Sequence, residues 1–172
     1  MNAIKPTILI DTREQMPLHF ENLPSEPATL PTGDYSIKGF EADFCVERKS
    51  IADLVQSVTH ERDRFERELT RMRGYEFRRL VIVGYPAQIE NHEYRSGASP
   101  KAVIASVTAF EIRYRLPVAW CPDAAAAAVQ IERWSCYFAR ERLKQAREIV
   151  TRFNDLHTGG CASKDASKDA SS

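Results

Sequence analysis

The sequence predicts one α/β domain in which helices flank a mixed central sheet. Two apolar runs, residues 7–10 and 80–83, have the length and composition of buried strands, and segments with helical spacing of apolar residues lie between and after them. Strands that alternate with helices are typical of an α/β fold. The chain has 172 residues, 43% of them hydrophobic, so it can bury one core of ordinary size.

The N-terminal part predicts a strand, a connection and a hairpin. Residues 7–10 (TILI) form the strand, and the proline-punctuated segment 17–31 is predicted to be a connection. Residues 33–49 (GDYSIKGFEADFCVERK) alternate apolar and polar side chains on either side of a turn-prone centre. Folding this hairpin about residues 40 and 41 pairs positions whose numbers sum to 81.

Two helices are predicted after the hairpin. Ser50 has a preferred side chain for an N-cap and Asp53 lies three residues later, so a capped helix is expected over 51–58. Apolar residues recur at helical spacing over 61–73, and Gly74 is expected to end that helix.

A buried strand, a helix, a short strand and a long helical segment are predicted in the remaining chain. The run 80–83 is the strand, and Pro100, in a first helical position, begins a helix that reaches about residue 115. Residues 117–120 (PVAW) predict a short buried strand, and 123–153 have a helical pattern. That length is unusual for one globular helix, so a break or a partner-facing surface is expected.

Residues 1–156 are predicted to form the domain and residues 157–172 a disordered tail, because ASKDASKDASS is low in complexity. Lysine plus arginine number 24, as do aspartate plus glutamate, so the net charge is zero and any basic surface must be local. The N-terminus shows neither a signal peptide nor a membrane-spanning run, so no membrane partner is expected.

The four cysteines are far apart and form no CxxC pair. They are interpreted as buried thiols rather than disulfides or zinc ligands, which is typical of a reducing, cytoplasmic compartment. These residues are Cys45, Cys121, Cys136 and Cys161. The four histidines show no ligand spacing and are interpreted as surface residues.

The hairpin register places two carboxylates, Asp34 and Glu47, opposite each other. Because side chains alternate along a strand, Lys49 shares the face of Glu47. Like charges placed opposite each other destabilise a sheet. Two close carboxylates can share a proton, pair with basic groups or bind a hard cation, and a solvated strand end is the alternative. A cation explains the pair best, because it removes the repulsion and leaves positions for a phosphate oxygen and a water.

Three short motifs resemble the nuclease domain of the XPF/Mus/Hef family of structure-selective endonucleases. The chain has DTRE at 11–14, GD at 33–34, and ERK at 47–49 followed by Asp53, and the family signature is GD, a variable spacer and ERKxxxD. The likeness extends from about residue 7 to about residue 123. It implies a restriction-endonuclease-like α/β core, that is, a nuclease domain that uses Mg²⁺ or Mn²⁺ to hydrolyse DNA phosphodiesters. The long C-terminal helical region is predicted from the helical pattern of residues 123–153, beyond the part that the likeness covers.

The resemblance also implies roles for individual residues. Asp34 and Glu47 would be metal ligands, and Asp11 would assist the same metal site. Lys49 would act on the attacking water or on the transition state. The remaining implied site residues are Glu14, which completes the acidic cluster, Arg48, which supports the site or touches DNA, and Asp53, which orients the basic residues.

Arginines near these motifs are candidates for DNA contacts. Residues 61–79 contain seven arginines against five acidic residues. One interpretation is a solvated helix with i,i+4 ion pairs, and the other is that Arg62 and Arg64 hold phosphates beside the metal site. Arg13 is as well placed to pair with its acidic neighbours as to contact DNA.

The C-terminal helical region is a candidate for self-association. Ile131, Trp134 and Phe138 form an apolar stripe that Ile149 continues, and the simplest interpretation is that it belongs to the core. Family members commonly pair through their nuclease domains, so a homodimer face is the alternative.

Two hypotheses about function follow from the resemblance. The first is a metal-dependent DNA endonuclease; its preference for branched or flap DNA stays open, because this chain shows neither the helix-hairpin-helix motifs nor the helicase module of many relatives. The second is a catalytically inactive DNA-binding or dimerisation partner with the same fold, although such subunits lack the carboxylates present here. Residues that contact only phosphate do not distinguish DNA from RNA. The compact form fits a bacterial or viral setting, including a nucleoid-associated one.

Overall fold

A six-stranded mixed sheet forms the centre of the structure, a computed structural model in which residues 4–158 are described. The strands are β1 (Ile8–Asp11), β2 (Ser25–Ala28), β3 (Tyr35–Ile37), β4 (Phe44–Ser50), β5 (Phe77–Val83) and β6 (Val118–Cys121). Their order across the sheet is β2-β1-β3-β4-β5-β6. The pairs β1–β3 and β3–β4 are antiparallel, whereas β1–β2, β4–β5 and β5–β6 are parallel.

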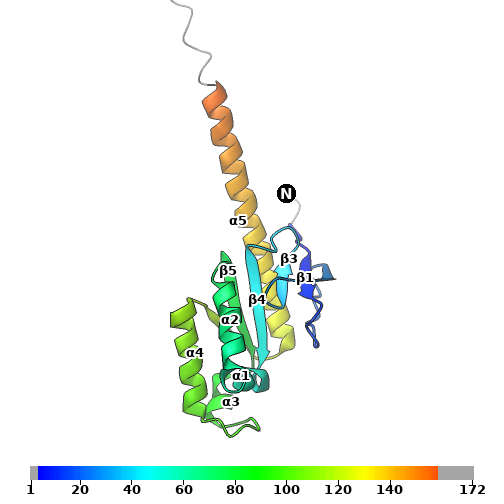
Figure 1. Ribbon diagram of the computed structural model, residues 1–172. Coiled ribbons are helices and arrows are strands. Elements are labelled where there is room, and N and C mark those ends of the chain that lie inside the picture. Colours follow the sequence, from blue (N-terminus) through cyan, green and yellow to red (C-terminus); the bar gives the residue numbers. More distant parts are fainter. Residues whose placement is uncertain (1–3, 159–172) are drawn as a thin grey trace, which may run out of the picture.

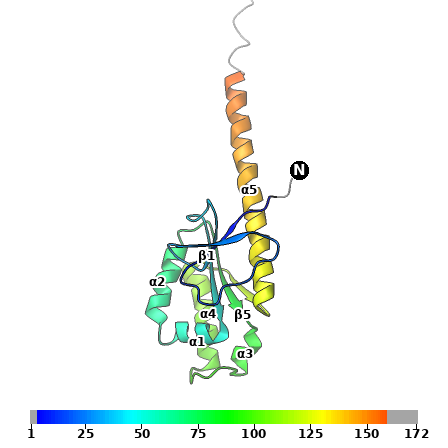
Figure 2. The ribbon, with the colours of Figure 1, turned by 90° about the vertical axis from the view of Figure 1, so that its right-hand side faces the viewer.

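Helices cover both faces of this sheet (Figures 1 and 2). They are α1 (Ile51–Val58), α2 (Arg62–Met72), α3 (Pro86–Glu90), α4 (Pro100–Tyr114) and α5 (Ala124–Thr158). Buried residues of α1, α2, α3 and α4 form one core cluster, and those of α5 with the loop 18–23 form the other. This arrangement confirms the predicted fold class, including the long C-terminal helix.

The β3–β4 hairpin has the predicted register. Tyr35 pairs with Val46, as the alternation of side chains requires. Phe44 and Val46 belong to the core cluster under α5, whereas Cys45 belongs to the cluster under α1 and α2. The residues of β4 therefore alternate between the two faces of the sheet, as predicted.

The predicted helices α1, α2 and α4 are present at the expected places. The Asp53 amide donates to the Ser50 hydroxyl (3.1 Å), so Ser50 caps α1 as predicted. Phe65, Leu69 and Met72 are the buried residues of α2. These apolar faces hold α1 and α2 against β4 and β5.

Two short elements lie in segments that the sequence pattern predicts as connections. β2 has the sequence SEPA, is partly exposed, and pairs along one side only, with β1. A proline is tolerated there because an edge strand does not use every amide in the ladder. α3 has five residues, of which only Ile89 is buried, so it is too short to give a helical pattern.

α5 is one continuous helix of 35 residues, so of the two expected alternatives, a break or a partner-facing surface, the break is not present. It ends at Thr158, so residues 157 and 158, which the sequence assigns to the tail, are helical, and the rest of the predicted tail lies outside the described residues. Ile131 and Phe138 are 0% and 9% exposed, which confirms the core interpretation, but Ile149 is 67% exposed and does not continue the buried stripe. The C-terminal half of α5 projects beyond the sheet (Figures 1 and 2).

Within the described residues, Cys45 and Cys121 are buried, Cys136 is half-buried, and all three are free thiols. Cys161 lies outside the described residues. No helix in residues 4–158 combines the length and apolar composition needed to cross a membrane.

Candidate active site

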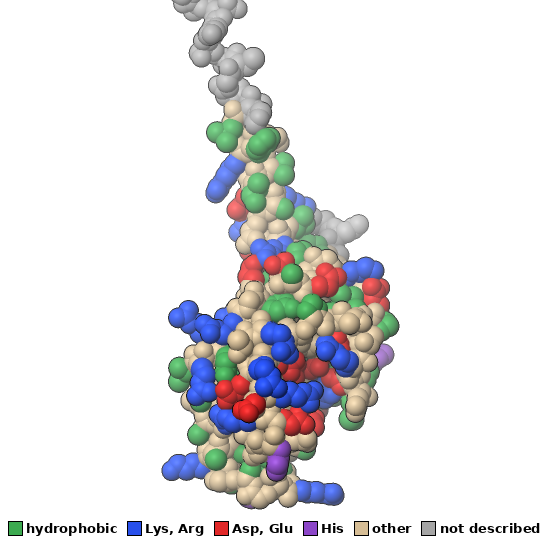
Figure 3. Space-filling view, viewed as in Figure 1, with side chains coloured by type: hydrophobic (Ala, Val, Ile, Leu, Met, Phe, Trp, Pro, Cys, Tyr) green, Lys and Arg blue, Asp and Glu red, His purple; other side chains and the backbone are tan. Residues whose placement is uncertain are grey.

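A cleft of about 400 Å³ opens where the loop after β1, the β3–β4 hairpin, α1 and the first half of α2 meet. Figure 3 shows acidic side chains surrounded by Lys and Arg on this face. Most of the sequence-predicted site residues line the cleft. They are Asp11, Arg13, Glu14, Asp34, Glu47, Arg48, Lys49, Asp53 and Arg64.

Asp34 and Glu47 come together because of the hairpin register. The Asp34 amide donates to the Val46 carbonyl (2.9 Å), one residue before the Tyr35–Val46 pair, so Asp34 lies next to Glu47 across the two strands. Asp34 Oδ2 accepts a hydrogen bond from the Arg48 amide (2.7 Å). Glu47, 2% exposed, forms an ion pair through Oε1 with Lys49 Nζ (2.6 Å). The predicted convergence of these acids and Lys49 is therefore present.

Gly33 makes room for this arrangement. Its φ is +75°, a left-handed conformation that glycine adopts without strain. A Cβ atom at this position would lie 2.5 Å from Cys45 Sγ and 3.0 Å from the Val46 carbonyl oxygen. The glycine of the GD motif thus lets the backbone that carries Asp34 approach β4.

We expect Gly33→Ala to lower the free energy of unfolding by about 2–4 kcal/mol, because it adds a steric clash to the cost of a left-handed alanine. Gly39→Ala is the matched control, since Gly39 also has a positive φ (+85°) but open space around its Cβ position. It should cost about 1 kcal/mol. Urea unfolding of both variants measures the difference, and equal losses would contradict the steric argument.

Both carboxylates of the pair are hard to ionise in the metal-free protein. Burial, with the charges of Glu14 and Glu68, raises the pKa of Asp34 to about 6, although the Arg48 amide and Lys49 oppose the shift. Burial and the charge of Asp34 raise the pKa of Glu47 well above its ordinary value, and Lys49 opposes this only in part. Two neighbouring carboxylates whose pKa values are both raised by burial and by each other's charge are typical of a functional site.

Glu14 and Arg48 form a buried ion pair at the edge of the cleft. Arg48 Nη2 lies 3.0 Å from Glu14 Oε1, and the two side chains are 12% and 8% exposed. Arg48 Nη2 also donates to the Met16 carbonyl (3.1 Å). Glu14 is therefore near the acidic pair, as predicted, with Arg48 as its direct partner.

We expect Glu14→Gln to lower the free energy of unfolding by about 1–3 kcal/mol, because it leaves the buried Arg48 charge without its counterion. Glu61→Gln is the control, since the Glu61–Arg64 pair is mostly exposed and should be worth under about 0.5 kcal/mol. Denaturant titration compares the two, and a loss at Glu14 no larger than at Glu61 would show that Arg48 is not buried in solution.

Asp11 is 2% exposed and has both oxygens occupied. Oδ1 accepts from the Arg13 amide (2.8 Å) and from Arg13 Nε (2.7 Å), and Oδ2 accepts from Arg13 Nη2 (3.0 Å) and the Leu30 amide (2.8 Å). Burial alone would raise the pKa of Asp11, but these hydrogen bonds lower it overall. Of the two alternatives for Arg13, the structure has the ion pair, and Asp11 anchors it rather than offering a free oxygen to the acidic pair.

Arg62 does not line the cleft, so its placement beside the metal site is not found, and of the two interpretations the structure has the i,i+4 ion pair for this residue. Its guanidinium pairs with Glu66 (2.9 Å), donates to the Ser106 hydroxyl (3.0 Å) and lies over the Phe110 ring of α4. Arg64, by contrast, lines the cleft, as predicted.

Asp53 lies in the cleft wall at the start of α1. Its Oδ2 accepts a hydrogen bond from the Ser50 hydroxyl (2.7 Å). No ion pair between Asp53 and a basic residue is present among the described residues. Its role in orienting basic residues stays a prediction.

Glu68 is a site residue that the sequence reasoning missed. It lines the cleft from α2, and its charge raises the pKa of both Asp34 and Glu47. The available signal was spacing, because Glu61, Arg64 and Glu68 recur at helical intervals on one side of α2.

The donor set fits a hard divalent cation. Oxygen atoms are the ligands that Mg²⁺ prefers, and it is commonly held by one or two carboxylates with waters and substrate phosphate completing the shell. Asp34 and Glu47 supply two carboxylates, each with one oxygen engaged by a protein group. No group of three or more His, Cys, Asp or Glu residues in the described chain has the geometry of a complete metal cage. A cation held by these two carboxylates would keep coordination positions for waters and a substrate phosphate.

The sheet, its flanking helices and the cleft define a restriction-endonuclease-like α/β core that carries buried acids and a lysine. The chain belongs to the ERCC4 domain family, whose model matches residues 10–133. This confirms the predicted resemblance to XPF-type nuclease domains.

Curated relatives support the same family. The chain is 30% identical over 142 residues to the DNA repair endonuclease XPF of Cricetulus griseus and 30% identical over 141 residues to that of Mus musculus, in each case over 76% of this chain and 15% of the relative. It is 41% identical over 63 residues to the DNA repair protein rad16 of Schizosaccharomyces pombe, over 34% of this chain and 7% of that protein. The chain thus spans about 15% of the length of the XPF relatives.

Solved structures show the same fold. XPF from Aeropyrum pernix matches with a TM-score of 0.62 and 22% identity, over 88% of this chain and 73% of that chain. The same protein in complex with DNA matches with a TM-score of 0.62 and 22% identity, over 93% of this chain and 88% of that chain.

Proposed function

We propose that this domain is a metal-dependent endonuclease that hydrolyses phosphodiester bonds in DNA. The observation that carries the proposal is the desolvated pair of Asp34 and Glu47, with Lys49 Nζ 2.6 Å from Glu47, in the cleft of an ERCC4 domain. Family relatives bear the name DNA repair endonuclease, and one structural neighbour is a DNA complex. These likenesses favour DNA as the substrate.

Asp34 and Glu47 would hold Mg²⁺ or Mn²⁺. When bound, the cation would lower the pKa of a coordinated water and neutralise charge on the phosphate. The carboxylates would have to be ionised to bind it, so their raised pKa values make metal binding weaker as the pH falls. Glu68 would add negative charge that favours the cation.

Lys49 would stabilise the charge that develops on the phosphate and orient the attacking water. Its Nζ lies between Glu47 and the Phe65 ring, 5.2 Å from the ring centroid. Burial alone would lower the pKa of Lys49, but the charges of Glu47 and Asp34 raise it overall. A protonated lysine can donate hydrogen bonds to a phosphoryl oxygen but cannot take a proton from water, so charge stabilisation is its favoured role.

The test is a cleavage assay on labelled duplex, single-stranded, flap and forked DNA, and on duplex RNA. The wild type should cleave DNA with Mg²⁺ or Mn²⁺ and not with EDTA. Glu47→Gln, which keeps the side-chain shape, should cleave on the order of 10³-fold more slowly or worse. Products of the flap and fork substrates decide whether branched DNA is preferred.

Three outcomes would contradict the proposal. Cleavage that persists in EDTA would rule out a metal-dependent reaction. Cleavage by Glu47→Gln at the wild-type rate would rule out the proposed active site. Binding without cleavage in either metal would favour the alternative, a catalytically inactive DNA-binding or dimerisation partner.

We also propose that the exposed part of α5 is a homodimer face. Leu143, Ile149, Val150 and Leu156 are 39%, 67%, 59% and 78% exposed on the part of α5 that extends past the sheet (Figure 1). Residues 143 and 150, and likewise 149 and 156, are seven apart, which is the spacing of paired helices. Sedimentation should give a dimer for the wild type and a monomer for Ile149→Glu/Val150→Glu. A wild-type monomer at all concentrations would contradict this face.

A reducing, cytoplasmic setting is part of the proposal. The free thiols Cys45, Cys121 and Cys136 fit this setting, because oxidising compartments favour disulfides.

A further inference from the structure

We infer that Arg64, Arg67 and Arg71 of α2 form a binding site for the sugar-phosphate backbone of a duplex arm that extends from the cleft. We name these three residues the arginine row. The inference rests on the proposed nuclease function and adds where the uncleaved part of the substrate would lie.

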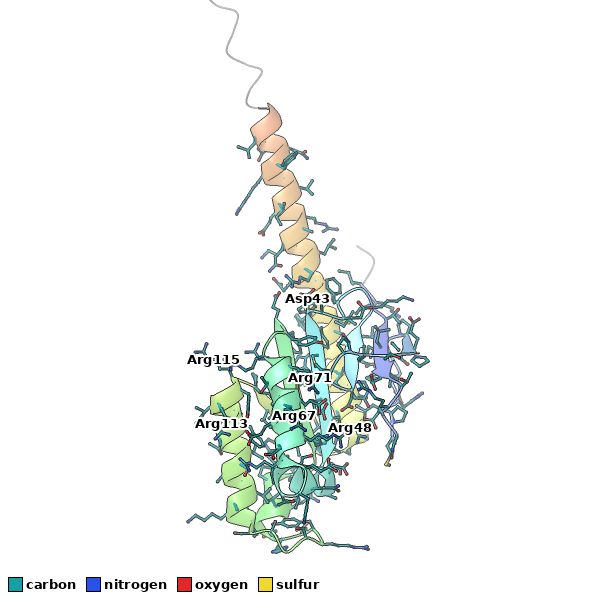
Figure 4. All side chains as sticks on the ribbon, in the orientation of Figure 1. Asp43, Arg48, Arg67, Arg71, Arg113 and Arg115 are labelled. Atoms are coloured by element: carbon teal, nitrogen blue, oxygen red, sulfur yellow. The ribbon has the colours of Figure 1, made fainter. Side chains whose placement is uncertain are left out.

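The arginine row is a continuous feature of one helix face. Positions 64, 67 and 71 are three and four residues apart, so their side chains lie above one another on α2. All three are exposed, while the opposite side of α2 packs on the core. At 1.5 Å of rise per residue, the row is about 10 Å long. Figure 4 shows Arg67 and Arg71 on the near side of α2.

The row begins inside the candidate active site. Arg64 lines the cleft together with Asp34 and Glu47, whereas Arg67 and Arg71 follow it along α2, away from α1. Lys and Arg side chains gather over this part of the surface next to the acidic centre (Figure 3). A strand whose phosphate enters the cleft would therefore meet the arginines on leaving it.

The outer part of the row carries uncompensated charge. Arg67 and Arg71 take part in no ion pair within residues 4–158, although α2 also contains acids. Other arginines near α2 are neutralised, since Arg62 and Arg113 both pair with Glu66. α2 has a net charge near zero, and its two arginines without an ion pair in the described residues, Arg67 and Arg71, lie on the face beside the cleft.

The chemistry of this row matches phosphate rather than base edges. Guanidinium groups bind phosphate through two parallel hydrogen bonds, and such contacts position a nucleic acid without reading its sequence. A single helix face with three exposed cations is convex and does not enclose a small ligand. An extended polyanion is the ligand that can contact all three at once.

The test is the salt dependence of DNA binding, measured by fluorescence anisotropy with a labelled duplex in EDTA, so that no cleavage occurs. Arg67→Ala/Arg71→Ala should lower the slope of log K against log salt by about 1.8 between about 50 and 200 mM NaCl, because each phosphate contact contributes about 0.9. Affinity at about 100 mM salt should fall on the order of 10-fold. Arg147→Ala/Arg152→Ala is the matched control, since these residues are exposed on the projecting part of α5 and remove the same charge.

The outcomes separate this inference from the proposed function. An unchanged slope in Arg67→Ala/Arg71→Ala, or an equal change in the control, overturns the arginine row even if the wild type cleaves DNA. A wild type that does not bind duplex DNA overturns it as well. The expected slope change in a protein that never cleaves supports the row and counts against the nuclease. Thermal melting should be the same for both double variants, because none of the four side chains is buried.

Discussion

Replacing Asp34 with asparagine should lower DNA cleavage on the order of 10³-fold or more and also raise the stability of the metal-free protein at neutral pH. Cleavage falls because asparagine lacks the charge with which Asp34 would hold a divalent cation beside Glu47. Stability rises because a buried charge next to another carboxylate is removed. The asparagine carbonyl can still accept the hydrogen bond from the Arg48 amide, so the hairpin is preserved.

The direction of the stability change follows from the pKa of Asp34. Burial, with the charges of Glu14 and Glu68, raises this pKa from 3.8 to about 6. Between these values the folded state binds more protons than the unfolded state, so stability falls as the pH rises. Above about pH 6 the full cost remains, on the order of 3 kcal/mol, since one pKa unit corresponds to about 1.4 kcal/mol. Asp34→Asn should remove this pH-dependent loss.

Thermal unfolding in EDTA between about pH 4 and pH 7 measures the effect. Asp63→Asn is the control, because Asp63 is exposed on α2 and does not line the cleft, so its substitution should leave cleavage unchanged. Added Mg²⁺ should stabilise the wild type and leave Asp34→Asn unchanged. Lower stability of Asp34→Asn at every pH would show that its charge is compensated in the absence of metal.

The hairpin and its acidic pair could be predicted because they depend on local patterns. Alternation along 33–49 sets the register, and the register alone places Asp34 beside Glu47 and Lys49 on the face of Glu47. A strand has only two faces, so a correct register assigns every side chain. The burial that raises the pKa of both acids can be predicted as well, because the two acids lie on neighbouring strands of a sheet that helices cover on both faces.

The orientations of the arginines on α2 could not be predicted in the same way. Residues two apart on a helix point about 200° apart, so Arg62 and Arg64 cannot both face one cleft. Which of them does so depends on how α2 is rotated about its axis when it packs on the sheet. The apolar residues of α2 show which face is buried, but they do not show which side of that face borders the cleft. Once Arg64 is known to line the cleft, Glu68 and Arg71 on the same side follow.

Asp11 shows the effect of an element that the pattern does not reveal. The end of β1 was predictable, but β2 gave no signal, and the chain that follows β2 brings the Leu30 amide to the Asp11 carboxylate. That contact and Arg13 together occupy both oxygens of Asp11. Asp11, which the sequence predicts as a metal ligand, is therefore hydrogen-bonded through both oxygens to groups of the protein.

Replacing Lys49 with methionine should lower cleavage by about 10²–10³-fold, as expected when one donor to a developing negative charge is lost. Methionine is close in length and keeps the apolar contact with Phe65, so the fold should be retained. The charge of Lys49 also opposes the rise in the pKa of Glu47. Without this charge, Glu47 should ionise only at higher pH, and the rising limb of the cleavage rate plotted against pH should shift to higher pH.

Single-turnover cleavage measured across pH with saturating Mg²⁺ separates the two effects of Lys49. Lys49→Arg keeps the charge, so its pH profile should match the wild type even though the planar guanidinium restores only part of the rate. Lys101→Met on α4 is exposed and should change neither the rate nor the profile. A role limited to packing would leave the pH profile of Lys49→Met in place. A shift of its rising limb to lower pH would contradict the charge coupling between Lys49 and Glu47 on which the proposed chemistry depends.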